Sequence, residues 1–177
     1  MGIIKKTAPV KLICGFIYHD KEYFIKSLDS VKALFGKTDY ESPELVFDKT
    51  SYYDREFGKG LFKKFISFEK LIDRTEITEV KIKTNLIEKE LSTGNKRTVN
   101  LDPGYLTLGQ LILATTKDRE HRIYVGKGIF CEVTLTFRDG EFIPYPWTYA
   151  DYASLEYRDV LKKIRQLLRE QMKKRIN

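Results

Sequence analysis

The sequence contains few of the residues that build metal and redox centres. Its 177 residues include two histidines, His19 and His121, and two cysteines, Cys14 and Cys131. Each cysteine lies inside an apolar stretch, so we expect reduced core thiols rather than a disulfide framework or half of a zinc site. Two histidines also exclude a histidine-rich metal site. We therefore predict no metal site, and the composition identifies no cofactor.

Long apolar runs are also missing. No segment approaches the roughly 20 apolar residues that a helix needs to span a bilayer. The start of the chain, MGIIKKTAPVKLICGF, lacks the apolar stretch and cleavage site of a signal peptide. No repeat period and no linker rich in proline, serine and glycine interrupts the sequence. We expect a soluble cytoplasmic protein with no membrane partner, folded as a single domain over residues 1–177.

Two glycine-containing segments resemble phosphate-binding motifs but do not have the required spacing. The segment 36–38, GKT, resembles the end of a phosphate loop, but the leading glycine would stand at position 31, which is a valine. The segment 126–128, GKG, lacks the third glycine of a dinucleotide fingerprint and joins two predicted strands. We interpret the first as a helix stop and the second as a turn. HExxH, GxSxG and CxxC patterns do not occur, so whether the protein is an enzyme stays open.

Positive charge is concentrated near the C-terminal end. The chain has 32 basic and 25 acidic side chains, a formal net charge of +7. Residues 154–177 hold eight of the basic and three of the acidic ones, so this segment carries +5 and the rest of the chain +2. Apolar residues recur there at helical spacing, which predicts a basic amphipathic terminal helix. Its basic stripe consists of Arg158, Lys162, Arg165, Arg169 and Lys173.

This helix allows two interpretations. It is either a docked helix whose solvated face is basic, or a rail for nucleic-acid phosphates. No aromatic residue interrupts the basic stripe, so base stacking is not indicated.

Strand and helix patterns alternate in the first two thirds of the chain. The apolar run at 10–18 predicts a strand covered on both faces, and a helix follows between Asp20 and Gly36. Strands are predicted at 44–48 and 62–68, with the even-numbered residues of the second on one side.

A second helix and a further strand complete this part. Asp73 and Glu76 form a capping-box pattern before a helix that reaches residue 91, and residues 50–57 resemble one or two helical turns. Another strand is expected somewhere within 98–116. Residues 100–106 are interpreted as a turn around Pro103 and Gly104, and residues 106–116 fit a helix, a strand or one leading into the other. The order predicts an α+β fold with a mixed or antiparallel sheet and a ferredoxin-like β-α-β-β-α-β core.

The C-terminal third predicts a β-meander before the terminal helix. Strands at 121–125, 129–137 and 141–145 are separated by GKG and by the hairpin signal DG at 139–140. Alternation directs the odd-numbered residues from Ile123 to Leu135 towards the core. A turn centred on Lys127 places Arg122 opposite Glu132 and Tyr124 opposite Phe130, which predicts an ion pair beside an aromatic pair.

Polar side chains in the second half form the leading candidate for a ligand site. They are Asp102, Tyr105, Lys117, His121, Arg122 and Glu132. The cationic donors among them suit a phosphate or a carboxylate. Glu132 either pairs with Arg122 or acts as a general base. Asp102 and His121 are the other catalytic candidates, and each also fits a structural role, as a turn cap or as a hydrogen-bonded strand residue.

Aromatic and acidic residues supply further candidates. Tyr124, Trp147 and Tyr149 are candidate ligand contacts, although rings in the segment 146–152, PWTYADY, also suit a plug between the sheet and the final helix. Acidic residues at 48, 69 and 73 could hold Mg²⁺ only if the fold brings them together.

Several strings in this sequence carry a family resemblance. They are NLDPGYL at 100–106, ATTK at 114–117, HRIY at 121–124, EVTL at 132–135 and WTY at 147–149. Over essentially its whole length the chain resembles the bacterial family labelled domain of unknown function 4416. Ala150 stands where members of that family usually have proline. The resemblance implies a bacterial, single-domain, cytoplasmic protein, and it brings no activity, cofactor or catalytic residue.

The candidate residues favour one function over two others. We expect a domain that binds an anionic small molecule, such as a nucleotide or a phosphorylated metabolite, with enzymatic activity left open. One alternative is an RNA- or ribosome-associated module that uses the basic helix. The other is a scaffold whose exposed aromatic residues bind another protein.

Overall fold

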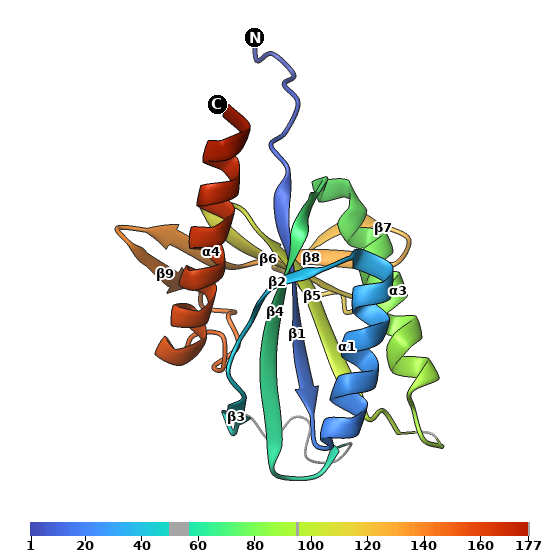
Figure 1. The fold of residues 1–177 in the computed structure, drawn as a ribbon. Coiled ribbons are helices and arrows are strands. Elements are labelled where there is room, and N and C mark those ends of the chain that lie inside the picture. The colour runs from blue at the N-terminus through green and yellow to red at the C-terminus, as the bar shows by residue number, and fades with distance from the viewer. Residues whose placement is uncertain (50–56, 95, 177) are drawn as a thin grey trace.

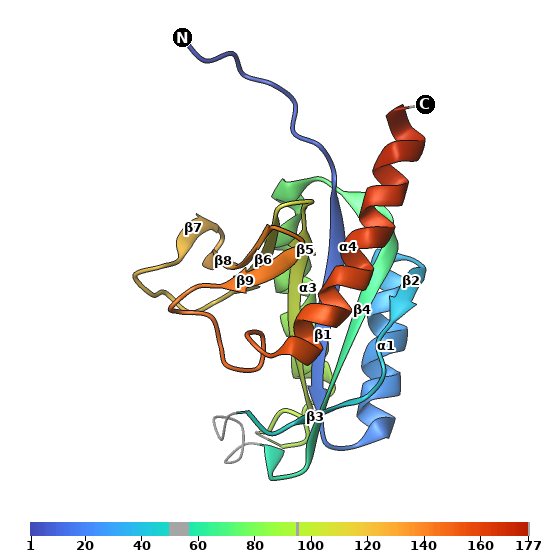
Figure 2. The same ribbon diagram turned by 90° about the vertical axis from the view of Figure 1, so that its left-hand side faces the viewer.

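The computed structural model describes residues 1–49, 57–94 and 96–176. Over these residues nine strands form one antiparallel sheet (Figure 1). Helices α1 (Lys21–Phe35) and α3 (Ile77–Glu90) cover one face, and helix α4 (Leu155–Ile176) covers the other (Figure 1, Figure 2). This arrangement confirms the predicted α+β class with a terminal helix. The helical turns predicted at 50–57 lie outside the described residues, apart from Phe57.

The first half of the chain forms the predicted ferredoxin-like core. Strand β1 (Val10–Tyr18) lies between β4 (Leu61–Ile72) and β5 (Val99–Leu106). Strands β2 (Thr38–Glu41) and β3 (Leu45–Phe47) both pair with β4 on its other side. Because β2 and β3 share one position beside β4, the order corresponds to β-α-β-β-α-β with antiparallel neighbours. The short polar strand β2 is one that the sequence pattern does not indicate.

Capping residues set the limits of the first two helices as predicted. Asp20 accepts a hydrogen bond from the backbone N–H of Glu22 (2.8 Å), and α1 ends before Gly36, whose φ is 97°. Asp73 and Glu76 form a capping box around the short 3-10 helix η1, which leads into α3.

Two apolar cores lie on opposite faces of the sheet. The first packs α1 and α3 against residues such as Phe16 and Phe68, and the second packs α4 against residues such as Ile13 and Phe65. β1 is buried along its whole length because it contributes to both cores. Cys14 and Cys131 are free and buried, which confirms the expectation of core thiols.

The turn predicted at Pro103 and Gly104 is wrong, because both residues lie within β5. Proline and glycine favour turns locally, but here pairing with β1 decides the conformation, and Pro103 stands opposite Cys14. The actual turn follows at 107–109, where the N–H of Thr107 donates to the carbonyl of Gln110 (2.9 Å).

The remaining strands extend the sheet beyond β5. They are β6 (Gln110–Thr115), β7 (Ile123–Gly126), β8 (Ile129–Arg138) and β9 (Glu141–Pro144), in the spatial order β5-β6-β8-β7, with β9 also paired to β8. Tyr124 stands opposite Phe130, and Arg122 pairs with Glu132, so the predicted cross-strand pairs are confirmed. The two predicted turns are present, one at 127–128, directly after Gly126 ends β7, and one at 139–140.

The inward orientation predicted for Ile123 and Val125 is wrong. Their exposed fractions are 70% and 39%. β7 is the edge strand of the sheet, and a register shift between Tyr124 and Gly126 interrupts the alternation that the prediction assumed. Among the described helices, none is long and apolar enough to cross a membrane.

Candidate functional site

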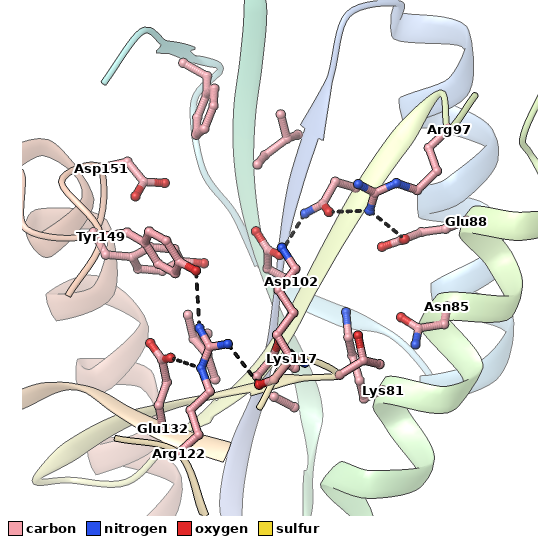
Figure 3. Close-up of a pocket in the computed structure, with 18 residues that line it drawn as sticks. Lys81, Asn85, Glu88, Arg97, Asp102, Lys117, Arg122, Glu132, Tyr149 and Asp151 are labelled. Atoms are coloured by element: carbon pink, nitrogen blue, oxygen red, sulfur yellow. Dashed lines mark hydrogen bonds and ion pairs between the residues drawn. The ribbon is translucent and has the colours of Figure 1, made fainter. Parts of the chain in front are cut away.

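A cavity of about 450 Å³ opens where β5 and β6 separate. The two strands pair only over residues 104–106 and 111–113, and beyond this point side chains from α3, the meander and the segment before α4 surround the space. Figure 3 shows Arg122, Glu132 and Tyr149 on one side of it and Arg97 and Glu88 on the other. The polar side chains that line it are Lys81, Asn85, Glu88, Arg97, Asn100, Asp102, Thr115, Thr116, Lys117, Arg122, Glu132, Tyr149, Asp151 and Tyr152.

The backbone of β5 differs on the two sides of the point where the strands separate. At Gly104 the strands still touch: a Cβ atom there would lie 2.3 Å from a backbone oxygen of β6, so only glycine allows this close approach. Pro103 has no N–H to donate. At Leu101, side chains of α3 replace a neighbouring strand: Lys81 donates to its carbonyl (3.0 Å), and Glu88 accepts from its N–H (2.6 Å). The cavity thus exists because α3, and not β6, satisfies this stretch of β5.

One wall of the cavity is a chain of hydrogen-bonded polar groups. Lys63 Nζ donates to Asp102 Oδ2 (2.6 Å), and Asn100 Nδ2 donates to Asp102 Oδ1 (2.7 Å). Arg97 Nη1 donates to Asn100 Oδ1 (2.8 Å) and to Glu88 Oε2 (3.1 Å). These bonds fix the orientation of the Asp102 carboxylate and of the Asn100 amide.

The opposite wall is centred on Arg122. Its Nε donates to Glu132 Oε2 (2.7 Å), its Nη1 to the carbonyl of Lys117 (3.0 Å) and its Nη2 to the hydroxyl of Tyr149 (3.2 Å). His121 Nε2 lies 3.3 Å from the same Glu132 oxygen. The side chains of Arg122 and Glu132 are only 4% and 2% exposed. The pair is therefore buried. Both faces of the meander are covered here, including the face that points away from the predicted core.

Burial and nearby charge divide the carboxyl groups into two kinds. Burial acts to raise the pKa of Asp102, but the charges of Lys63 and Lys81 and the hydrogen bonds to the carboxylate hold that pKa below its ordinary value. Burial raises the pKa of Glu88, although Lys81 opposes the change. Burial also raises the pKa of Asp151, and the charge of Asp102 adds to this effect. Asp102 is thus held ionised, while Glu88 and Asp151 take up protons more readily than ordinary carboxyls.

The cavity brings together five of the side chains that the sequence analysis selected. They are Asp102, Lys117, Arg122, Glu132 and Tyr149. Tyr105 is not among them, because residues three positions apart in a strand point to opposite faces. Its ring packs against the core beneath α1 and α3. Tyr124 also lies outside, on the edge strand, where its ring contacts Phe130 at 5.3 Å between centroids.

His121 and Trp147 line a second, open hollow next to the cavity. Their rings stack at 5.5 Å between centroids, and Trp147 also stacks on Tyr145 at 4.7 Å. Arg122 and Tyr149 line both spaces and so lie between them. Of the aromatic segment before α4, Tyr152 is the buried plug, whereas Trp147 and Tyr149 remain partly exposed.

Much of the basic stripe on α4 is occupied by contacts within the chain. Arg158 donates to the carbonyl of Phe142 (3.0 Å), and Lys162 pairs with Glu141 (3.0 Å). Arg165 donates to the carbonyl of Leu108 (2.7 Å), and its guanidinium lies 3.5 Å from the centroid of the Phe137 ring. These three residues dock the helix onto the meander and onto the turn at 107–109, as the first of the two interpretations expects. The remaining members, Arg169 and Lys173, lie towards the C-terminal end.

Several site residues have no signal in the sequence analysis. They are Lys63, Lys81, Asn85, Glu88, Arg97 and Asn100, whereas Asp151 and Tyr152 belong to the aromatic segment 146–152 that the sequence does single out. A lysine on the inward-facing side of a strand, such as Lys63 two residues before Phe65, is the one local hint. In the part of the chain that the structure describes, no group of three His, Cys, Asp or Glu side chains is placed to hold a metal ion. The acidic residues at 48, 69 and 73 therefore form no such group.

Comparison with known proteins gives a family and nothing beyond it. No curated protein and no solved structure matches the chain. A family model described as Domain of unknown function (DUF4416) matches residues 8–168, nearly the whole length, and the chain therefore belongs to this family.

Proposed function

We propose that the protein binds an anionic small molecule, a nucleotide or another phosphorylated metabolite, in the cavity between β5 and β6. The observation that carries the proposal is the convergence of Lys117 and Arg122 with the fixed carboxylate Asp102 on one enclosed space. A volume of about 450 Å³ suits a ligand of that size. The cytoplasm, where such metabolites occur, is the compartment we infer, and two buried free thiols fit it.

The balance of charges around the cavity favours an anion. Four basic and four acidic side chains line it, and buried Lys63 adds a fifth positive charge beside Asp102. Because burial raises the pKa of Glu88 and of Asp151, these two carboxyls resist ionisation. An incoming phosphate therefore meets a lining with a positive balance.

Arg122 is the group best suited to hold the anion. Three of its five N–H groups donate to the described partners Glu132, Lys117 and Tyr149. The planar fork then retains two N–H groups for a phosphate, a geometry that guanidinium groups favour. Glu132 also accepts a hydrogen bond from Thr134 (3.3 Å), so we assign it to positioning Arg122 rather than to proton abstraction.

A binding assay with two matched variants tests this proposal. Isothermal titration calorimetry would use inorganic phosphate, ribose 5-phosphate, AMP and GMP. Lys117→Met removes a cation that lines the cavity, and we expect it to weaken binding roughly tenfold or more, as for the loss of one charge-assisted bond. Arg119→Met removes the same charge from the same loop, but Arg119 lines only the open hollow, so affinity should not change.

Two outcomes would contradict the proposal. If none of the compounds binds the unmodified protein, the cavity is not a site for phosphorylated ligands. If Arg119→Met weakens binding and Lys117→Met does not, the ligand occupies the open hollow instead.

A further inference from the structure

One side chain in the cavity has a polar group without a partner. Tyr152 is 3% exposed and lines the cavity, and its hydroxyl makes no hydrogen bond with any described residue. Its ring is held by edge-on contacts with Phe65 (5.7 Å) and Tyr157 (5.9 Å) and by the Lys63 ammonium, 5.1 Å from its centroid. Buried hydroxyls nearly always have a partner, so this one suggests a ligand group at this end of the cavity.

Asp102 and Asn100 present matching groups at the same cavity. The Asp102 carboxylate has accepted one bond on each oxygen, from Lys63 and from Asn100, and each oxygen retains a further lone pair. The Asn100 carbonyl oxygen accepts from Arg97, which sets the amide so that its nitrogen faces Asp102. The second amide N–H of Asn100 makes no bond with a described residue. The wall therefore offers acceptors and donors together.

On the basis of the proposed function, we propose that Asp102, Asn100 and Tyr152 bind the hydroxyl groups of a sugar, so that the ligand is a sugar phosphate or a ribonucleotide. A hydroxyl group donates to a carboxylate and accepts from an amide or a phenol at the same time. A ligand group that carries charge of only one sign fits this wall less well. A phosphate would face the ionised carboxylate of Asp102, and an ammonium would face buried Lys63. The anionic end then belongs with Lys117 and Arg122, and the sugar with the Asp102 wall.

Paired compounds that differ by one hydroxyl test this inference. Calorimetry would compare ribose 5-phosphate with 2-deoxyribose 5-phosphate, and AMP with dAMP. We expect the hydroxylated member of at least one pair to bind roughly three- to tenfold more tightly, as for one hydrogen bond in a buried site.

Two tyrosine variants locate the contact. Tyr152→Phe removes only an unpartnered hydroxyl, so the fold should be retained, while the affinity for the hydroxylated compound falls by roughly the same three- to tenfold factor. Tyr157→Phe is the matched control, because its hydroxyl is also buried without a partner in the same aromatic cluster but does not line the cavity. It should leave affinity unchanged.

The failure of this inference differs from the failure of the proposed function. If both members of each pair bind equally, or if Tyr152→Phe binds the hydroxylated compound as tightly as the unmodified protein, sugar recognition by this wall is refuted. Lys117→Met would in that case still weaken binding. If no phosphorylated compound binds at all, the proposed function fails and this inference fails with it.

Discussion

Lys63 pairs with Asp102 at 2.6 Å although the two residues stand on strands that are not neighbours. Lys63 belongs to β4 and Asp102 to β5, and β1 runs between them. The lysine crosses β1 at Gly15, whose partner on β5 is Asp102 itself. The side chain of Lys63 is fully buried beneath this crossing. The ion pair that fixes the cavity wall therefore depends on a glycine in the central strand.

Gly15→Ala should break this arrangement. An added Cβ would lie 2.9 Å from Lys63 Cε and 3.3 Å from the Phe65 ring. Lys63 could move away only by leaving Asp102, so we expect a loss of about 1–3 kcal/mol in the free energy of unfolding, as for overpacked cores. Urea denaturation followed by circular dichroism would measure it. Gly109→Ala, where nothing lies within 4 Å of the added atom, is the control and should be neutral.

A double-mutant cycle would measure the pair directly. Lys63→Met or Asp102→Asn alone leaves one buried charge without its partner, and each should cost about 3–5 kcal/mol. The double variant should cost clearly less than the sum of the two, because it leaves neither charge unpaired. Additive costs in urea denaturation would show that the two residues stabilise the fold independently.

Local patterns predicted the strands of the meander and two of its cross-strand pairs. Arg122 pairs with Glu132 because the turn at 126–128 sets the register, and turn and strands are adjacent in the sequence. The capping residues Asp20 and Asp73 act within one helical turn. Such interactions depend on a few consecutive residues, so a single sequence contains the information.

Most of the cavity wall depends on long-range packing, which no local pattern contains. Lys63 reaches Asp102 across β1. Glu88 accepts a hydrogen bond from the backbone of β5 at Leu101, where β6 no longer pairs with β5. The error over Tyr105 has a simpler cause. Once residues 100–106 are interpreted as a turn, Asp102 and Tyr105 look like neighbours, whereas in a strand they face opposite cores.

Stability should depend on pH through Glu88. Burial raises the pKa of this carboxyl above the ordinary value of 4.5, so between the two values the folded protein binds more protons than the unfolded chain. Stability should therefore fall as pH rises through this window. Glu88→Gln keeps an oxygen for the Leu101 N–H and removes the titration, so its stability should decline less with pH. Urea denaturation from pH 4.5 to 8 would compare the two proteins.

A control variant sharpens that test. Glu90→Gln lies on the same helix and is exposed, so it should reproduce the unmodified pH profile. Parallel profiles for Glu88→Gln and the unmodified protein would contradict the assignment. Asp102 should change stability in the opposite direction, because its pKa is lowered in the folded protein. The stability that its carboxylate contributes is present above the ordinary pKa of 3.8 and is lost as pH falls through the lower folded pKa.

We expect Arg165 to stabilise the fold, whether or not the basic helix binds a partner. Its guanidinium stacks 3.5 Å from the Phe137 ring centroid and donates to the carbonyl of Leu108. We expect Arg165→Ala to lower the free energy of unfolding by about 1–2 kcal/mol, from the cation–π contact and the hydrogen bond together. Arg169→Ala, which removes the same charge one turn later from an exposed position, is the matched control and should be nearly neutral.

The same two variants separate the alternatives for the basic helix. If α4 is a docking helix, Arg165→Ala unfolds at lower urea concentration than Arg169→Ala, and neither changes retention on an RNA column. If α4 is a rail for phosphates, both substitutions should weaken RNA binding by similar factors and reduce its salt dependence, because each removes one phosphate contact. Equal stability of the two variants would show that the contacts of Arg165 with the meander do not hold the helix in place.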